Sequence, residues 1–269
     1  MIELPIWSLF PLALVVSTIS VAGGMGGGLL YTPLLVLGYG LSPLLGLATA
    51  LVLELFGFVS GLVQYVRLKS IDYSLVKKLI IFSVPGTIVG VMLSRVIPSN
   101  VLQWLLAGTL VYLSIIFLRG HIKTKPKHPH YTGLKHPHPE VDVTSQILAS
   151  TMFGGGLVGL LSGGLGEINE YNFLTKIGLK PAHAAGTSVM LVSISALVGI
   201  ILHGLLFVYE GETLQLQSLA PILLYSVTGV MVGAWLGVRI ATHIGVRHLK
   251  YLLATLFCFS ALLAIISQW

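Results

Sequence analysis

The sequence predicts an all-α integral membrane protein built from two inverted repeats of about five membrane segments each. Three observations lead to this prediction. Of the 269 residues, 55% are hydrophobic and only 9% are charged, whereas charged residues make up about 25% of a typical soluble domain. Apolar stretches long enough to cross a hydrocarbon core about 30 Å thick recur along the whole chain. Motifs of the first half also return in the same order about 140 residues later.

The repeated motifs start with a glycine cluster in each half. In the first half they are Gly-Met-Gly-Gly-Gly at 24–28, Gly-Leu-Ser-Pro at 40–43, Ala-Thr at 48–49 and Ser-Val-Pro-Gly at 83–86. In the second half they are Gly-Leu-Gly at 164–166, Gly-Leu-Lys-Pro at 178–181, Gly-Thr-Ser at 186–188 and Ser-Val-Thr-Gly at 226–229. Broken apolar segments at matching places in two halves of a membrane protein point to the binding site of a transporter.

Helices are the predicted form of every span. The apolar runs are continuous rather than alternating, which excludes the strands of a membrane barrel and leaves helices. The stretch from Pro5 to Ala22 lacks the basic region that opens a signal peptide, so we interpret it as a first span.

Each half is predicted to contain a span, a short segment that starts with the glycine cluster, and three further spans. In the first half these are about Ile6–Ala22, Gly28–Leu37, Pro43–Val66, Leu75–Ile97 and Val101–Leu118. In the second half they are about Ser145–Ser162, Glu167–Ile177, Pro181–Phe207, Leu219–Ile240 and Val246–Ser267. As helices, the short segments cover only about half of the bilayer, so each is either re-entrant or part of a broken crossing.

Loop charges predict the orientation of the two repeats. The loop at 67–78 carries several basic residues, whereas the equivalent loop at 208–218 carries Glu210 and Glu212 and no base. Because basic loops stay in the cytoplasm, equivalent loops are expected on opposite sides of the membrane. This requires five crossings per half, inverted repeats and both termini outside the cytoplasm. The chain then divides into a first repeat at 1–118, a linker at 119–143 and a second repeat at 144–269.

The linker is a polar stretch rich in lysine, proline and histidine, and we expect it to be a flexible cytoplasmic connector. Its histidines at 128–138 leave open a metal-ion permease as an alternative, because imidazole is a common metal ligand. Lys and Arg are placed between apolar runs, which predicts no nucleic-acid partner. No nucleotide-binding or protease motif is visible, so the sequence predicts neither a cofactor nor an enzyme.

The glycine clusters are candidates for binding an anion. The first N–H groups of a helix lack internal partners and carry a partial positive charge, and glycines let an anion approach the backbone closely. Hydroxyl and amide groups at matched positions can add further contacts. The predicted substrate-binding residues are Gly26, Gly27, Gly28, Thr49, Gly164, Gly166, Asn169, Thr187 and Ser188.

Simpler roles compete with this prediction. Small residues allow helices to pack closely, and hydroxyls in apolar helices often bond to a carbonyl of their own helix. Close packing is the role that we expect for three glycine pairs, namely Gly57 with Gly61, Gly86 with Gly90, and Gly229 with Gly233.

Three carboxylates within apolar segments are predicted to couple transport to an ion: Glu54, Glu167 and Glu170. Carboxylates inside a membrane are costly and usually face a cavity, a partner or an ion path. Desolvation favours the neutral form, which suits a proton carrier, and carboxylate oxygens together with Asn169 also suit a sodium ion. The alternatives are a helix cap for Glu167 and Glu170, and a structural hydrogen bond for Glu54.

The motifs resemble those of the TauE/SafE family of membrane permeases over nearly the whole chain except the linker. The residues that carry the resemblance are Gly24-x-Gly26-Gly27-Gly28, Pro33, Pro43 and Ala48-Thr49, repeated as Gly164-x-Gly166-Glu167, Pro181 and Gly186-Thr187-Ser188. The resemblance implies export or uptake of small sulfur-containing anions, such as sulfite or organosulfonates, across the cytoplasmic membrane. Glu167-Ile168-Asn169 replaces a glycine pair of the family pattern, which leaves room for a proton or cation on that side.

Together these observations predict a secondary transporter of the cell membrane that moves a small anion by alternating access, coupled to a proton or a sodium ion. An anion channel remains the nearest alternative, since a channel would show the same spans. The expected partners are the anion, the coupling ion and the lipid bilayer. The sequence leaves open whether the chain works alone or as a homo-oligomer.

Overall fold

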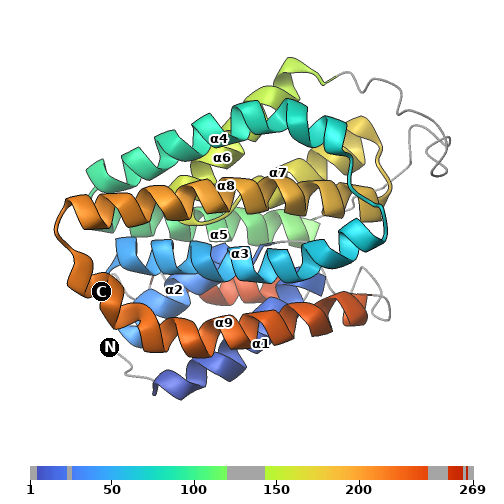
Figure 1. The fold of residues 1–269 in the computed structure, drawn as a ribbon. Helices are drawn as coiled ribbons and strands as arrows, with labels where there is room; N and C mark the ends of the chain where they lie inside the picture. The colour runs from blue at the N-terminus through green and yellow to red at the C-terminus, as the bar shows by residue number, and fades with distance from the viewer. Residues whose placement is uncertain (1–4, 23–25, 120–142, 242–253, 263–264, 266–269) are drawn as a thin grey trace.

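A computed structural model describes residues 5–22, 26–119, 143–241, 254–262 and 265. Within these residues the chain is helical and contains no strand (Figure 1). The helices are α1 (Leu9–Ala22), α2 (Gly28–Tyr39), α3 (Pro43–Arg67), α4 (Tyr73–Val96), α5 (Ser99–Arg119), α6 (Ser145–Leu161), α7 (Leu165–Asn172), α8 (Pro181–Tyr209) and α9 (Thr213–Ala241). A 3₁₀ turn (Ile6–Ser8) precedes α1, a π-helical turn (Phe173–Ile177) follows α7, and residues 254–262 are also helical. The linker histidines at 128–138 lie outside the described residues.

The prediction of an all-α membrane protein is confirmed. Four helices in the described part of the chain are long and apolar enough to cross a membrane: α3, α4, Ala182–Tyr209 of α8 and Leu219–Gly237 of α9. The shorter apolar helices include α2, whose 12 residues extend about 18 Å. The short segments predicted from the glycine clusters therefore exist as separate helices.

Matching turns delimit the two short segments. Gly40 ends α2 and Gly178 ends the turn after α7, both in the left-handed conformation with φ of 68° and 79°. Glycine adopts this conformation without the steric penalty of a Cβ atom. The next helix then begins with a proline in each case, Pro43 for α3 and Pro181 for α8. Proline suits the first helical turn because its missing N–H would have no partner there.

Glycines bring α4 and α6 into backbone contact. A Cβ atom at Gly86 would overlap the carbonyl oxygen of Met152, and one at Gly90 would overlap that of Gly156. Side chains at these positions would push the helices apart. The predicted packing role of this glycine pair is confirmed.

The contact between α1 and α9 has the same form. A Cβ atom at Gly229 would overlap the carbonyl oxygen of Phe10, and one at Gly233 would overlap that of Leu14. The first helix of each half thus packs against the fourth helix of the other half, at glycines that the sequence comparison had paired. This exchange of partners is the pattern that a duplicated unit would produce.

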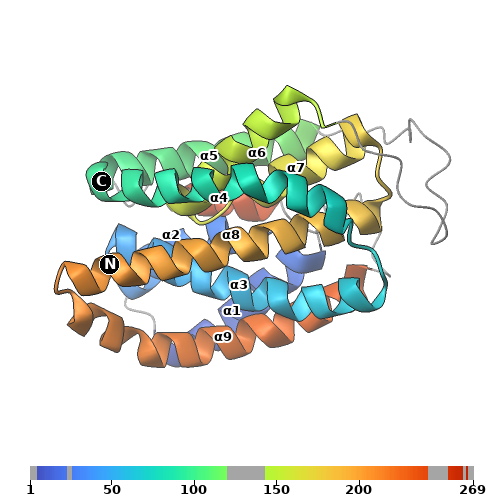
Figure 2. The same cartoon turned by 45° about the horizontal axis from the view of Figure 1, so that its top comes forward.

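The third helix of each half, α3 and α8, meet side by side and run in opposite directions. Gly199 of α8 lies against Leu51 early in α3, whereas Gly186 lies against Tyr65 near the end of α3. α8 also contacts α4, where the Ser195 hydroxyl donates to the Ser83 hydroxyl over 3.1 Å. Figures 1 and 2 show α8 between the group of α4, α6 and α7 and the group of α1, α3 and α9.

An arginine joins the end of α4 to the end of α8. The Arg95 guanidinium pairs with the Glu210 carboxylate, donates to the carbonyl of His203 over 3.3 Å, and lies 4.3 Å from the centre of the Phe207 ring. Its side chain is only 12% exposed. These contacts place the end of α4 beside the acidic loop at 208–218.

Candidate functional site

The two breaks in the helical segments touch each other. Ser162 ends α6 with φ of 62°, a left-handed conformation that is uncommon for a residue other than glycine. Its hydroxyl contacts the carbonyl of Gly28 at 3.1 Å and the hydroxyl of Thr32 at 2.6 Å. A Cβ atom at Gly28 would overlap the Ser162 carbonyl oxygen. The first turn of α2 is therefore fixed directly against the gap between α6 and α7.

Glu54 of α3 lies over the start of α2. A Cβ atom at Gly26 would overlap its Oε1, and one at Gly28 would lie 3.0 Å from its carboxyl carbon. The Gly28 backbone N–H hydrogen-bonds to this carboxyl group. Glu54 is 3% exposed, and its Oε2 has no hydrogen-bond partner in the structure. The glycines at the start of α2 thus admit the protein's own carboxyl group to the end of the helix where an anion is favoured.

A small cavity of about 190 Å³ lies next to Glu54, between α1, α2, α3 and α9. The residues that line it include Gly27 and the hydroxyl-bearing Ser17, Ser20 and Tyr31. Tyr31 is hydrogen-bonded to Ser17, whose hydroxyl donates to the carbonyl of Val230 over 2.8 Å. The cavity therefore combines a carboxyl group with several hydroxyls.

The start of α7 has its own carboxyl group. Oε2 of Glu167 accepts a hydrogen bond from the backbone N–H of Gly164 at 3.1 Å, which caps the helix. Glu167 is buried, and its Oε1 has no partner. The Ser188 hydroxyl of α8 donates to the carbonyl of Gly166 over 3.1 Å. Glu167 is also close enough to Glu54 for the two carboxyl groups to interact electrostatically.

No basic side chain in the described part of the chain pairs with either carboxyl group. The described Lys and Arg residues belong to the ends of the helices and to the turns between them: Arg67, Lys69, Lys77, Lys78, Arg95, Arg119, Lys176, Lys180 and Arg239. Two unpaired buried carboxylates would be costly. The helix-start N–H groups of Gly28 and Gly164 are the donors that the structure places beside Glu54 and Glu167. The described residues hold no cluster of three or more His, Cys, Asp or Glu that could bind a metal ion.

Three other predicted site residues have local or peripheral partners. The Thr49 hydroxyl donates to the Leu45 carbonyl of its own helix over 2.7 Å. Asn169 accepts from Thr151 of α6 at 2.9 Å through Oδ1, while its Nδ2 is buried without a partner. Glu170 is half-buried and interacts electrostatically with Tyr65. Tyr65 is eleven residues after Glu54 on α3, about 16 Å along the helix.

Thr187 joins α8 to the turn before α4. Its hydroxyl accepts a hydrogen bond from the backbone N–H of Asp72 at 3.0 Å, and the Asp72 side chain caps α4 by accepting from Leu75 N–H at 3.0 Å. Thr187 and Asp72 are both buried. The structure thus gives Thr187 a bonding partner away from the start of α2.

Thr187→Val is expected to lower stability by about 1–3 kcal/mol, because it leaves the buried N–H of Asp72 without an acceptor. Thermal unfolding of the purified protein measures the loss. Thr187→Ser keeps the acceptor oxygen and is the matched control. Equal stability of the Val variant and the wild type would show that this hydrogen bond does not hold the turn.

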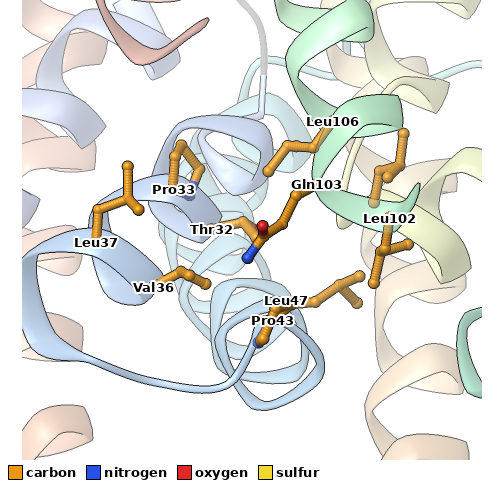
Figure 3. A pocket seen from close by; sticks show the side chains of 10 residues that line it. Thr32, Pro33, Val36, Leu37, Pro43, Leu47, Leu102, Gln103 and Leu106 are labelled. Carbon is orange, nitrogen blue, oxygen red and sulfur yellow. The ribbon is translucent and has the colours of Figure 1, made fainter. Parts of the chain in front are cut away.

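A second cavity in the described structure is apolar. It offers about 380 Å³ between α2, α3, α5 and α6, and its lining carries no charged group (Figure 3). Thr32 and Gln103 are its polar side chains, and Figure 3 shows Gln103 reaching from α5 toward α2. Such a lining offers little to an oxyanion, so the junction at Gly28 is the better candidate site.

Comparison with known proteins places the chain in a family. The family model described as "Sulfite exporter TauE/SafE" matches residues 9–264. The chain belongs to the TauE/SafE family. The resemblance inferred from the glycine motifs is thereby confirmed.

Two curated relatives of this TauE/SafE protein come from Bacillus subtilis (strain 168). "Probable membrane transporter protein YjnA" is 27% identical over 245 residues, which cover 89% of this chain and 91% of the relative. "Probable membrane transporter protein YunE" is 24% identical over 249 residues, with 87% and 86% covered. No solved structure matches the chain. The prediction of a membrane transporter is thus confirmed at the level of the family.

Sequence reasoning missed several polar residues of the junction, namely Ser17, Ser20, Tyr31, Thr32 and Ser162. Each is a polar residue within or next to an apolar segment, and this pattern could have marked them as candidates for the site. Ser162 directly precedes the second glycine cluster. Which of these hydroxyls face the break depends on packing between α1, α2 and α6, which the sequence does not specify.

Proposed function

We propose that this TauE/SafE protein is a secondary transporter that carries a small sulfur oxyanion or organosulfonate across the cytoplasmic membrane by alternating access. The observation that carries the proposal is the junction where α2 begins against the break between α6 and α7. Gly26, Gly28, Glu54 and Glu167 meet there, buried within the apolar bundle.

Helix geometry supports an anion as the substrate. The N-terminal N–H groups of α2 and α7 carry partial positive charge, and glycines expose the backbone at both places. The family description names sulfite export, which fits a compact oxyanion with several acceptor atoms. Gly27 completes the proposed substrate contacts at α2, and Gly164, Gly166 and Ser188 form the matching helix start of the second repeat.

Charge compensation supports coupling to a proton or a sodium ion. An anion at the junction adds negative charge beside Glu54 and Glu167, which have no basic partner among the described residues. Proton or sodium binding at these carboxyl groups offsets that charge. Glu170 interacts with Tyr65 rather than with Glu54. We therefore place its role in coupling on the path by which the ion reaches the site.

We also assign the two halves to inverted repeats. The antiparallel course of α3 and α8 supports this, as does the exchange of glycine contacts between α4–α6 and α9–α1. The acidic loop at 208–218 and the basic loop at 67–78 then face opposite sides. This arrangement puts the linker at 119–143 in the cytoplasm and both termini outside.

Uptake into proteoliposomes tests the proposed function. We expect saturable uptake of radiolabelled sulfite, sulfoacetate or thiosulfate that responds to an imposed proton or sodium gradient. Protein-free liposomes with the same gradients are the control. Flux that does not saturate and does not depend on either gradient would indicate a channel. Absence of flux for all three anions would contradict the proposal that the substrate is a sulfur oxyanion or organosulfonate.

A further inference from the structure

We propose that the Glu54 carboxylate and the transported anion compete for the start of α2, so that the anion binds only when Glu54 is protonated. This inference rests on the proposed function and makes it specific: Glu54 is the residue that couples one proton to the anion, and α2 rather than α7 supplies the anion site.

The geometry at α2 places the Glu54 carboxyl group where an anion would bind. It accepts from the Gly28 N–H, and its oxygen Oε1 fills the space that a Cβ atom of Gly26 would need. Anions at a helix start use these same N–H groups. A substrate anion must therefore displace the carboxyl group or lie directly beside it.

Glu54 is not part of the helix whose start it caps. It belongs to α3, so its position relative to α2 changes whenever the two helices shift. Its Oε2 is buried without a partner and it borders the cavity of Ser17, Ser20 and Tyr31, which gives the side chain a polar place to move.

Glu167 at the start of α7 differs in this respect. It is part of the helix that it caps, and Oε2 is bonded to Gly164 N–H three residues away. This cap moves with its own helix and keeps the N–H group occupied. The matching helix start in the second repeat is therefore occupied by a side chain of the same helix.

Electrostatics makes the competition depend on pH. The titratable groups that face Glu54 are Tyr31 of α2 and Glu167 of α7, and none of the described basic residues does. Neither neighbour can neutralise a carboxylate together with a bound anion. One proton taken from water onto Glu54 for each anion bound removes one negative charge from the site, which offsets a monovalent anion fully and a divalent anion by half, and opening to the other side releases both.

The sign of the pH dependence follows from this linkage. At low pH Glu54 is neutral and the anion binds with its full affinity. As the pH rises through the titration of Glu54, the affinity falls, approaching about tenfold per pH unit when the anion binds only the protonated form. Glu54→Gln mimics the neutral acid and is expected to bind at every pH with the affinity that the wild type shows at low pH.

The test measures the affinity of the purified full-length protein for sulfoacetate and thiosulfate by calorimetry between pH 5.5 and 8.5. Both anions keep their charge over this range. Proton uptake is obtained from titrations in buffers with different ionisation heats. We compare the wild type with Glu54→Gln, and use Glu212→Gln, in the turn after α8, as a control that removes a carboxylate outside the bundle. Thermal unfolding confirms that each variant is folded.

The proposal predicts falling affinity and net proton uptake in the wild type and in Glu212→Gln, and neither effect in Glu54→Gln. Folded Glu54→Gln that keeps the wild-type pH dependence, or that loses anion binding at all pH values, would overturn the competition while leaving anion transport in place. Failure of both anions to bind the wild type at every pH would instead contradict the proposed function, and the competition with it.

Discussion

Gly28→Ala is expected to lower the affinity of transport for the anion strongly. Its Cβ atom would overlap the carbonyl oxygen of Ser162 and press on the Glu54 carboxyl group. A backbone oxygen cannot move aside as a side chain can, so α2 must separate from the break between α6 and α7. Overpacking of this kind costs about 1–3 kcal/mol. The same amount lost from substrate binding would weaken the affinity by roughly fivefold to more than a hundredfold. Uptake into proteoliposomes and thermal unfolding measure the two effects.

Gly108→Ala is the matched control, because no atom lies within 4 Å of the Cβ position at Gly108. It should transport and unfold like the wild type. If Gly28→Ala does not fold, Gly27→Ala is the milder variant, since the nearest atoms to its Cβ position belong to the Tyr31 side chain rather than to backbone. If Gly28→Ala folds and takes up the anion like the wild type, the start of α2 is not part of the transport path.

Gly90→Val and Gly233→Val are expected to destabilise the protein severely and by similar amounts. A Cβ atom at Gly90 would overlap the carbonyl oxygen of Gly156, and one at Gly233 would overlap that of Leu14. Both contacts join backbones of neighbouring helices, and valine adds two methyl groups beyond the Cβ atom. We expect each variant to lose about 3 kcal/mol or more, seen as a lower melting temperature and less monodisperse protein.

Gly204→Val is the control for these variants, since nothing lies within 4 Å of its Cβ position. Near wild-type stability of either variant would show that the glycine contact is not required. A large effect at one glycine and none at its counterpart would contradict the equivalence of the α4–α6 and α1–α9 contacts, and with it the repeat.

Helix boundaries were predictable from the sequence where a specific residue sets them. The prolines Pro43 and Pro181 mark the starts of α3 and α8 as predicted. Hydropathy alone was less informative: the ninth helix was predicted from Leu219 but begins at Thr213, because polar residues extend a helix beyond its apolar part. The π-helical turn after α7 has no pattern that distinguishes it from a continued α-helix.

The partners of polar side chains were not predictable from the motifs. Thr49 and Thr187 occupy matched positions in the repeats, yet Thr49 bonds to its own helix and Thr187 to the turn before α4. The hydrogen-bond partner of a hydroxyl group depends on which distant segments pack against it. Glu54 was recognised as unusual because a carboxyl group within an apolar span is costly, but its contact with Gly28 depends on how α3 crosses α2.

Locating a bound anion tests the central claim most directly. Crystals of the protein grown at acidic pH and soaked in selenite, a heavier analogue of sulfite, would show selenium by anomalous scattering. The account predicts a selenium peak within hydrogen-bond reach of the Gly27 and Gly28 N–H groups, next to Glu54, that is absent from Gly28→Ala crystals. A peak at α7 alone, in the apolar cavity of Figure 3, or nowhere in the bundle would contradict an anion site at the start of α2.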